Sequence, residues 1–400
     1  MWLINTTSGV LTEFDNEDPP YYAILSHRWG AKEQEQTFKE YRKGLKLDTP
    51  GHYKILKLRE IALTDGYEWV WVDSACIDKR SSAELSEAIN SMFTWYRNAG
   101  KCYALLSDID NTDEEGWKSS EWWSRGWTLQ ELLAPADVTF LDTSWKIIGT
   151  KLYHARDIWV ITGIPESVLL GRVSYMNWTV AQKLSWAADR RTKRIEDRAY
   201  SLLGLFNINM PLLYGEGHKA FRRLQIEILQ KFSDESILAW DPPRELLNVP
   251  HEVLAYSPDD FANCPEMEPS IHPDDFRSGS QRMQTVLRVE DPPRPTSWGI
   301  EFRSHAHRLK PLTGTSILVD GRYHQFLYAV TLTAAWAGKV RELPCTIVLV
   351  QSGPAVLTYK RLACIRLSTD EALQRLRGEF VVGERLMDLR FYLRYDTDFG

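Results

Sequence analysis

The sequence predicts an α/β fold in which a parallel sheet has helices on both faces, followed by a helical extension and a C-terminal β-rich domain. Two observations lead to this prediction. Over the first 150 residues, short apolar runs alternate with segments whose apolar residues have helical spacing, which is typical of a helix-covered parallel sheet. Beyond residue 297, strand-like runs follow one another directly, which indicates an antiparallel β domain.

Four apolar runs are the expected parallel strands. The first follows Pro19-Pro20, and each is short enough to be a buried strand. The runs are Tyr21–Ser26, Trp69–Val72, Cys102–Leu106 and Val138–Leu141.

Three helices are expected between these strands. Helical spacing of apolar residues extends from Tyr53 to Leu63 and again from Leu85 to Tyr96. Ser81 or Ser82 can cap the second of these helices. The third helix is short, with Glu131 on its opening turns and Pro135 at its end.

The chain divides into four predicted segments. Residues 1–150 form the α/β core, 151–240 the helical extension, 241–296 a connector and 297–400 the β-rich domain. The connector holds ten of the nineteen prolines, mixed with acidic residues, which favours loops over regular structure.

Composition excludes several classes of protein. A net charge of -6 and a pI near 5.9 argue against a general nucleic-acid binder. Five cysteines without a C-x-x-C pair fit neither a disulfide framework nor a zinc site, so we expect reduced thiols and a cytoplasmic protein. Met1–Asn5 does not resemble a signal peptide, and no apolar run approaches the length of a membrane span.

Familiar catalytic motifs are also missing from the sequence. It contains no G-x-x-x-x-G-K-[ST] phosphate loop, no H-E-x-x-H metal motif and no G-x-S-x-G nucleophile elbow. We therefore expect no catalytic metal and no tightly bound cofactor.

Polar residues follow three of the expected strands. They are Ser26, His27, Arg28 and Trp29 after the first, Asp73, Cys76 and Asp78 after the second, and Trp127 and Glu131 after the third. Because the carboxyl ends of parallel strands meet at one edge of a sheet, these loops are expected to line one cleft. Each residue also has a structural interpretation: Asp73 as a cap, Cys76 as a small buried side chain, Arg28 as an ion-pair partner.

Five segments, in order from the N-terminus to about Trp240, carry a resemblance to a known family. They are Tyr22–Gly30, Trp71–Asp78, Arg125–Leu132, Glu196–Gly204 and Met210–Gly217. Together they are similar to the fungal HET (heterokaryon incompatibility) domain proteins. Arg28 departs from the family pattern, in which a small residue such as Thr is common at that position.

The resemblance implies a role in self/non-self recognition, with programmed death of incompatible fused fungal cells. It also implies a fold similar to TIR domains, whose sheet is flavodoxin-like. Ala23–Arg28 is similar to the first-strand motif of TIR proteins, and Trp127–Leu132 to the W-C-L-x-E-L of plant TIR domains, with Thr128 in place of Cys. In that pattern the glutamate is the catalytic residue of NAD cleavage, so the resemblance implies Glu131 as catalytic residue and NAD as substrate.

This chemistry is coherent with a single carboxylate. Loss of nicotinamide from NAD passes through an oxocarbenium-like ribose, which a nearby carboxylate stabilises. The leaving group is already a cationic pyridinium, so no general acid is required. We expect Trp29 or Trp127 to stack on a ring, and Arg28 to hold a phosphate and keep Glu131 ionised. Ser26, Asp73, Cys76 and Asp78 would complete the NAD-binding cleft.

Two functions from different classes remain open on the sequence. The first is a NAD-cleaving death effector that becomes active when copies self-associate through the TIR-like domain. The second is a non-enzymatic signalling module whose TIR-like surface assembles partners, which the sequence does not identify. A transferase or phosphohydrolase on the same sheet is a distant third, since no motif supports it.

Overall fold

A computed structural model of the 400-residue chain describes residues 1–110, 115–232, 234–240, 253–264, 267–269 and 293–296, together with the strands between residues 299 and 394. Two compact units divide the chain. The first comprises Met1–Ser174 and Arg190–Ala220, and the second Tyr175–Asp189 and Phe221–Gly400. Most of the predicted connector, residues 241–296, lies outside the described residues. The four predicted segment boundaries stay predictions.

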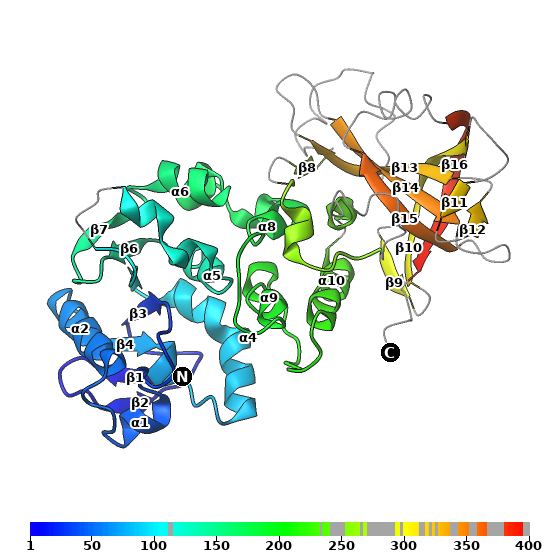
Figure 1. Cartoon of the computed structure of the whole chain (residues 1–400). Helices are drawn as coiled ribbons and strands as arrows, with labels where there is room; N and C mark the ends of the chain where they lie inside the picture. Colours follow the sequence, from blue (N-terminus) through cyan, green and yellow to red (C-terminus); the bar gives the residue numbers. More distant parts are fainter. Residues whose placement is uncertain are drawn as a thin grey trace. The chain divides into compact units, whose positions relative to one another are not determined.

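The first unit is built on a seven-stranded sheet in the order β2-β1-β4-β3-β5-β6-β7 (Figure 1). Its middle is parallel and consists of β3 (Tyr22–His27), β4 (Trp69–Val72), β5 (Lys101–Leu105) and β6 (Val138–Leu141). Every residue of β3 and β6 is buried, as in strands that are covered on both sides. The predicted set of parallel strands is confirmed.

Three further strands at the edges of the sheet, which the sequence did not predict, are antiparallel. β1 (Trp2–Asn5) pairs antiparallel with both β2 (Leu11–Glu13) and β4, and β7 (Ile147–Thr150) pairs antiparallel with β6. The chain connections explain this, because β1–β2 and β6–β7 are joined by only a few residues. Such short connections permit hairpins but not the long crossover that parallel strands need.

Helices cover both faces of the parallel strands. α2 (Pro50–Thr64) leads from β3 to β4, and α4 (Ser82–Asn98) leads from β4 back across β3 to β5. Because these connections cross the sheet in opposite directions, right-handed crossovers place the two helices on opposite faces. Figure 1 shows α2 and α4 on opposite sides of the strands. α5 (Thr128–Leu133) follows β5 and packs against α4.

Local sequence explains where the two long helices begin. The Thr49 hydroxyl accepts a hydrogen bond from the His52 N–H, with Pro50 at the first helical position of α2. The Ser81 hydroxyl accepts from the Glu84 N–H, so Ser81 is the cap of α4. The remaining helices of this unit are α1 (Phe38–Arg42), α3 (Asp73–Cys76), α6 (Ala155–Thr162), α7 (Glu166–Leu169) and α9 (Asp197–Tyr200), with 3₁₀ turns at Gly116–Ser119, Glu121–Ser124 and Gly204–Phe206.

An aromatic cluster fixes the segment that precedes α5. The Trp122 ring lies 4.8 Å from Trp123 and 5.7 Å from Phe140 of β6, measured between centroids. Trp117 lies 5.8 Å from Trp123 in the same way. All four rings are buried, so the 3₁₀ turns before α5 are anchored on the sheet.

The second unit combines short helices with a second seven-stranded sheet. Its helices are α8 (Val180–Ser185) and α10 (Lys219–Lys231), with 3₁₀ turns at Tyr175–Asn177, Glu235–Leu238 and Pro258–Phe261. The sheet runs β8-β13-β14-β15-β16-β10-β9, and β10 also pairs with β13. The strands are β8 (Met267–Pro269), β9 (Arg294–Thr296), β10 (Gly299–Pro311), β13 (Leu327–Trp336), β14 (Leu343–Gln351), β15 (Thr358–Ile365) and β16 (Phe380–Arg394), with β11 (Ile317–Val319) and β12 (Arg322–His324) as a separate pair.

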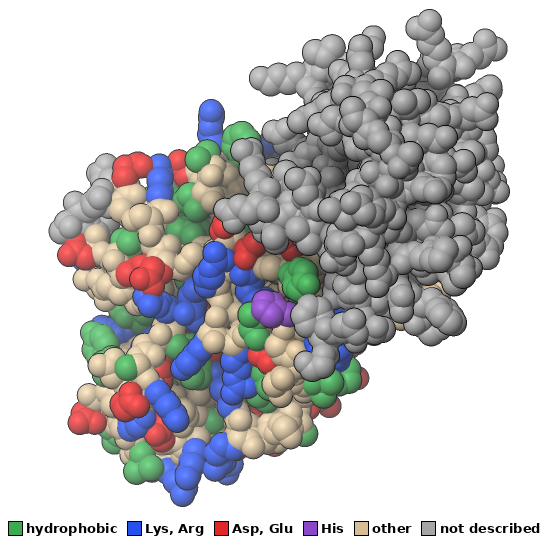
Figure 2. Space-filling model, turned by 45° about the vertical axis from the view of Figure 1, so that its right-hand side comes forward, with side chains coloured by type: hydrophobic (Ala, Val, Ile, Leu, Met, Phe, Trp, Pro, Cys, Tyr) green, Lys and Arg blue, Asp and Glu red, His purple; other side chains and the backbone are tan. Residues whose placement is uncertain are grey.

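This β-rich region departs from an all-antiparallel arrangement in one place. β15 and β16 pair in parallel through Thr358 and Tyr359, whereas the other pairs of this sheet are antiparallel. Among the described residues, no helix is long and apolar enough to cross a membrane. Figure 2 shows lysine and arginine side chains gathered on one face of the described part, although the net charge is negative.

Candidate functional site

The candidate site lies where the order of the parallel strands reverses. β3 has β4 on one side and β5 on the other, so the connections from β3 and β5 run to opposite sides of the sheet. At the carboxyl ends, Leu25 of β3 pairs with Val72, and His27 pairs with Leu105. The segments after these strands therefore start at one edge, which is where open α/β sheets bind ligands.

Glu131 is buried at this edge and joined to β3. It lies in the first turn of α5 and is 8% exposed. The Ser26 hydroxyl, at the end of β3, donates a hydrogen bond to the Glu131 Oε2. The same hydroxyl accepts a hydrogen bond of 2.8 Å from the Trp122 indole. The carboxylate is thus held by a continuous chain of hydrogen bonds from the aromatic cluster.

Burial raises the pKa of Glu131 to about 7, because the charged form loses hydration. The hydrogen bond from Ser26 opposes this shift, the negative charge of Asp73 adds to it, and Arg125 and Tyr96 oppose it. Burial also lowers the pKa of the Arg190 guanidinium to about 10, while Glu131 acts to raise it. At neutral pH the carboxylate is therefore divided between its ionised and neutral forms.

A second group of side chains gathers around Asp73, the first residue after β4. The Trp29 indole donates to Asp73 Oδ2 at 2.8 Å, and the Lys79 ammonium donates to the same oxygen at 3.0 Å. Lys79 Nζ also lies 3.5 Å from the centroid of the Trp29 ring, which is a close cation–π contact. Burial alone would raise the pKa of Asp73, but the charge and the hydrogen bond of Lys79 hold it below its usual value.

His27 lies next to Ser26 in β3 and faces Asp73, so it stands between the Glu131 group and the Asp73 group. Its Nδ1 lies 3.7 Å from Asp73 Oδ1, and its Nε2 is buried without a hydrogen-bond partner among the described residues. Burial, reinforced by the charge of Lys54, holds the pKa of His27 well below its usual value, although Asp73 opposes the shift. The imidazole is therefore neutral at physiological pH.

The loop after β3 is fixed by a buried ion pair. Lys54 Nζ lies 2.8 and 2.9 Å from the two carboxylate oxygens of Glu35, and the Gly30 N–H donates to Glu35 Oε1 at 2.7 Å. Both charged side chains are at most 10% exposed. This pair holds the loop that carries Trp29 towards Asp73.

Four of the predicted site residues interact with groups other than Glu131 and Asp73. They are Arg28, Asp78, Cys76 and Trp127. Arg28 forms an ion pair with Glu121 in place of the expected interaction with Glu131, and both side chains are largely exposed. Asp78 accepts from Arg80 Nε at 2.8 Å.

Cys76 is buried and accepts a hydrogen bond from the backbone N–H of Val72 at 3.5 Å. Burial raises the pKa of its thiol to about 12, which is typical of an unreactive structural cysteine. Trp127 acts to lower the pKa of Asp197, which burial raises.

Several groups near Glu131 and Asp73 are not among the residues predicted from the sequence. They are Tyr96, Trp122, Arg125 and Arg190, together with Lys79 beside Asp73. Arg125 stands within the motif around Glu131, so motif membership could have identified it. Arg190 and Tyr96 come from distant segments, and no local pattern marks them.

Replacing Trp122 by phenylalanine is expected to lower the free energy of unfolding by about 1–3 kcal/mol. The ring still fits, but the fully buried Ser26 hydroxyl loses the donor of its 2.8 Å hydrogen bond. Urea unfolding followed by fluorescence measures the difference. An unchanged midpoint would show that the Trp122 indole does not support Ser26.

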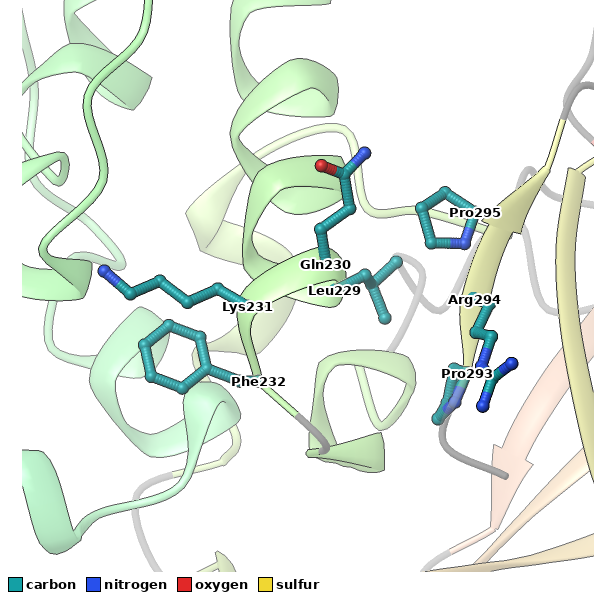
Figure 3. A pocket seen from close by; sticks show the side chains of 7 residues that line it. All are labelled: Leu229, Gln230, Lys231, Phe232, Pro293, Arg294 and Pro295. Carbon is teal, nitrogen blue, oxygen red and sulfur yellow. The ribbon is translucent and has the colours of Figure 1, made fainter. Parts of the chain in front are cut away.

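No group of three or more His, Cys, Asp or Glu residues that could hold a metal is found in the described part of the chain. A cavity of about 340 Å³ lies in the second unit, between the end of α10 and β9 (Figure 3). Its lining includes Lys231, Phe232 and Arg294, and none of the predicted site residues. The groups at the Glu131 site that could take part in chemistry are one carboxylate and two nearby guanidinium groups. The carboxylate is buried in this structure.

Comparisons with known proteins find a similarity to one family within the first unit. Residues 22–119 match the family model described as heterokaryon incompatibility protein (HET), and residues 219–379 match a domain of unknown function (DUF8212). No solved structure matches the chain. The HET match covers β3, β4 and β5, whose carboxyl edge forms the candidate site.

The chain is also similar to the vegetative incompatibility protein HET-E-1 of Podospora anserina. The two are 44% identical over 219 residues, which is 52% of this chain and 16% of HET-E-1. The chain thus spans a small part of the length of that relative. With the motifs identified in the sequence, these matches confirm the predicted resemblance to the HET family for this part of the chain.

Proposed function

We propose that this HET domain is a cell-death effector of heterokaryon incompatibility and that it acts by cleaving NAD at Glu131. The similarity to HET-E-1, a vegetative incompatibility protein, supports the cellular role. The position of Glu131 is the single observation that carries the chemistry. Its carboxylate lies on the first turn of the helix after β5, at the edge where ligands bind in open α/β sheets.

The proposal includes a TIR-like fold for the first unit. In chain order, the four parallel strands are arranged second, first, third, fourth across the sheet. This is the beginning of the flavodoxin-like order, whose ligand site lies between the first and third strands. Here those strands are β3, which carries Ser26 near its carboxyl end, and β5, which is followed by the helix that carries Glu131.

In the proposed reaction the bond between ribose C1′ and the nicotinamide nitrogen breaks. The bonding electrons leave with nicotinamide, which departs as a neutral base, and water adds to C1′ and releases a proton. The products are nicotinamide and ADP-ribose. Ionised Glu131 stabilises the oxocarbenium-like ribose, while the hydrogen bond from Ser26 holds the carboxylate in place.

The burial of Glu131 favours a second candidate function. The carboxylate is only 8% exposed and accepts a hydrogen bond from a buried serine, an arrangement that also suits a structural group. In this alternative the domain signals by assembling partners through its surface, and Glu131 has no chemical role. Self-association is compatible with either function.

The two candidates differ in one measurement, nicotinamide release from NAD by the purified chain at low and high protein concentration. Glu131→Gln is expected to lower the release at least about 100-fold, as removal of a group that stabilises transition-state charge commonly does. Glu121→Gln is the matched control, because Glu121 is an exposed carboxylate in the neighbouring turn. Circular dichroism checks that both variants fold.

The pH profile provides a second test. Since the pKa of Glu131 is about 7, the release is expected to rise with pH through that value as the carboxylate ionises. Absence of release at any concentration would favour the signalling alternative. Release that persists in Glu131→Gln would place the chemistry at another residue.

A further inference from the structure

A segment from the end of the first unit crosses the loop that precedes α5. We call residues 190–197 the strap. The Arg191 N–H donates to the Ser124 carbonyl at 2.6 Å, and the Gly126 N–H donates to the Arg191 carbonyl at 2.8 Å. These bonds form a parallel bridge between Arg125 and Arg191. The backbone of the strap is therefore bonded to the loop five to seven residues before Glu131.

Side chains of the strap hold the same loop. The buried Arg190 guanidinium donates to the Arg125 carbonyl at 3.0 Å and to the Thr128 hydroxyl at 3.1 Å. The strap thus bonds Ser124, Arg125, Gly126 and Thr128, in the segment that leads into the turn that carries Glu131.

The contact is too close for a side chain on Gly126. A Cβ built on this residue would lie 2.4 Å from Thr192 Cγ2 and 3.4 Å from Ser201 Oγ. The first distance is far below van der Waals contact, whereas the second is tolerable. Glycine is therefore required here by the strap, and the methyl group of one threonine accounts for the requirement.

The strap begins where the chain passes from one compact unit to the other. Asp189 belongs to the second unit and Arg190 to the first. The Asp189 N–H donates to Asp259 Oδ1 at 2.7 Å, within the second unit, and the Asp189 backbone has a positive φ of 59°. Consecutive residues are thus fixed in different units, so a change in the second unit at Asp189 acts directly on the strap.

We propose that the strap is an autoinhibitory latch, which keeps Glu131 enclosed and is released from the second unit through Asp189. Release of the strap removes the contacts of the loop from Ser124 to Thr128, and α5 can then move and admit a ligand to the carboxylate. Local opening of this kind needs only the loss of a few contacts, not of the sheet. The consequence for catalysis rests on the proposed function, but the latch itself does not.

Hydrogen–deuterium exchange of the full chain tests the latch without any NAD chemistry. Gly126→Ala is expected to speed exchange of the amides from 124 to 133 by about tenfold or more, because the new methyl displaces the strap. Thr192→Ser removes the opposing methyl, so Gly126→Ala/Thr192→Ser is expected to restore the protection. Thr192→Ser alone is the matched control. If Gly126→Ala does not fold, Arg190→Leu replaces it.

Unchanged protection of α5 in Gly126→Ala, or faster exchange that spreads over the whole sheet and is not restored by Thr192→Ser, would overturn the latch. Asp259→Ala tests whether the second unit regulates the strap, and Asp260→Ala is the matched control variant. Both carboxylates accept a hydrogen bond from Ser257 at the start of the same 3₁₀ turn, but Asp259 also accepts one from the Asp189 N–H. Faster exchange at 124–128 is expected in Asp259→Ala only. The same result in both variants, or in neither, would refute control through Asp189.

Failure of the latch proposal and failure of the NAD proposal can be distinguished in the same samples. If exchange responds as expected while no variant releases nicotinamide, the latch stands and the NAD proposal fails. If Gly126→Ala releases nicotinamide faster than the wild type but exchange at α5 is unchanged, the NAD proposal stands and the latch fails.

Discussion

Glu131→Gln is expected to stabilise the protein by about 3 kcal/mol at pH 8 and to leave its stability nearly unchanged below pH 4.5. The pKa of Glu131 is raised from 4.5 to about 7 by burial. A carboxyl group with a raised pKa favours the folded state below its unfolded pKa, where it is neutral in both states. This stability is lost between pH 4.5 and 7, as the unfolded chain ionises first. Glutamine stays neutral throughout and can still accept from Ser26.

Urea unfolding of the two proteins at pH 4.5, 6 and 8 measures this difference. The wild type is expected to lose stability relative to the variant across that range, with the largest change before pH 7. Glu121→Gln, at an exposed position, controls for the general effect of removing a negative charge. A variant that is less stable than the wild type at pH 8 would show that the ionised carboxylate is well compensated by its neighbours.

Lys54→Met is expected to destabilise the protein by about 3–5 kcal/mol, because it leaves the carboxylate of Glu35 buried without its cation. The Glu35 side chain is only 4% exposed, so water cannot replace the lost partner without a movement of the loop. Lys54→Met/Glu35→Gln removes both charges, and most of the lost stability is expected to return. The amide oxygen of glutamine can still accept from the Gly30 N–H.

A double-mutant cycle of Lys54→Met and Glu35→Gln, measured by urea unfolding, gives the coupling between the two side chains. Near-additive effects would contradict the argument, since they would mean that the residues act independently. Lys57→Met is a suitable control, because Lys57 pairs with the largely exposed Glu60 on the same helix. Its loss is expected to stay within about 1 kcal/mol.

The parallel strands could be predicted because their composition reports burial on both faces. β3 and β6 are mostly apolar, and all their residues are buried. The edge strands carry less information. β7 (Ile147–Thr150) has an exposed first residue and three partly exposed ones. It therefore lacks the run of buried apolar residues that marks the central strands in the sequence. Its pairing depends on the hairpin connection rather than on its own hydrophobic pattern.

The site could be predicted in outline, because topology places the ends of parallel strands together. The positions of the strand ends predicted that Ser26 lies near Glu131 and Trp29 near Asp73, and each pair shares a hydrogen bond. The positions of the strand ends do not determine which ion-pair partner a long side chain reaches. Arg28 reaches Glu121 and not Glu131, and which carboxylate lies within its reach depends on the path of the loop.

Arg190 shows a different limit of sequence reasoning. It lies 59 residues after Glu131, in the next predicted segment, and the sequence around it resembles an ordinary helix end. Its importance arises from the return of the chain to the first unit after residues 175–189. A long-range return of this kind leaves no periodic or compositional signal.

That return has a consequence for biosynthesis. The first unit lacks its final segment until Ala220 has left the ribosome, well after Ser174 has done so. At ordinary rates of translation this interval is roughly 2–9 s, long enough for the sheet to form while residues 190–220 are still missing. A nascent chain therefore passes through a stage in which the sheet exists and its last segment does not. Truncation at Ser174 would make that stage permanent, so a stable fragment needs to extend at least to Ala220.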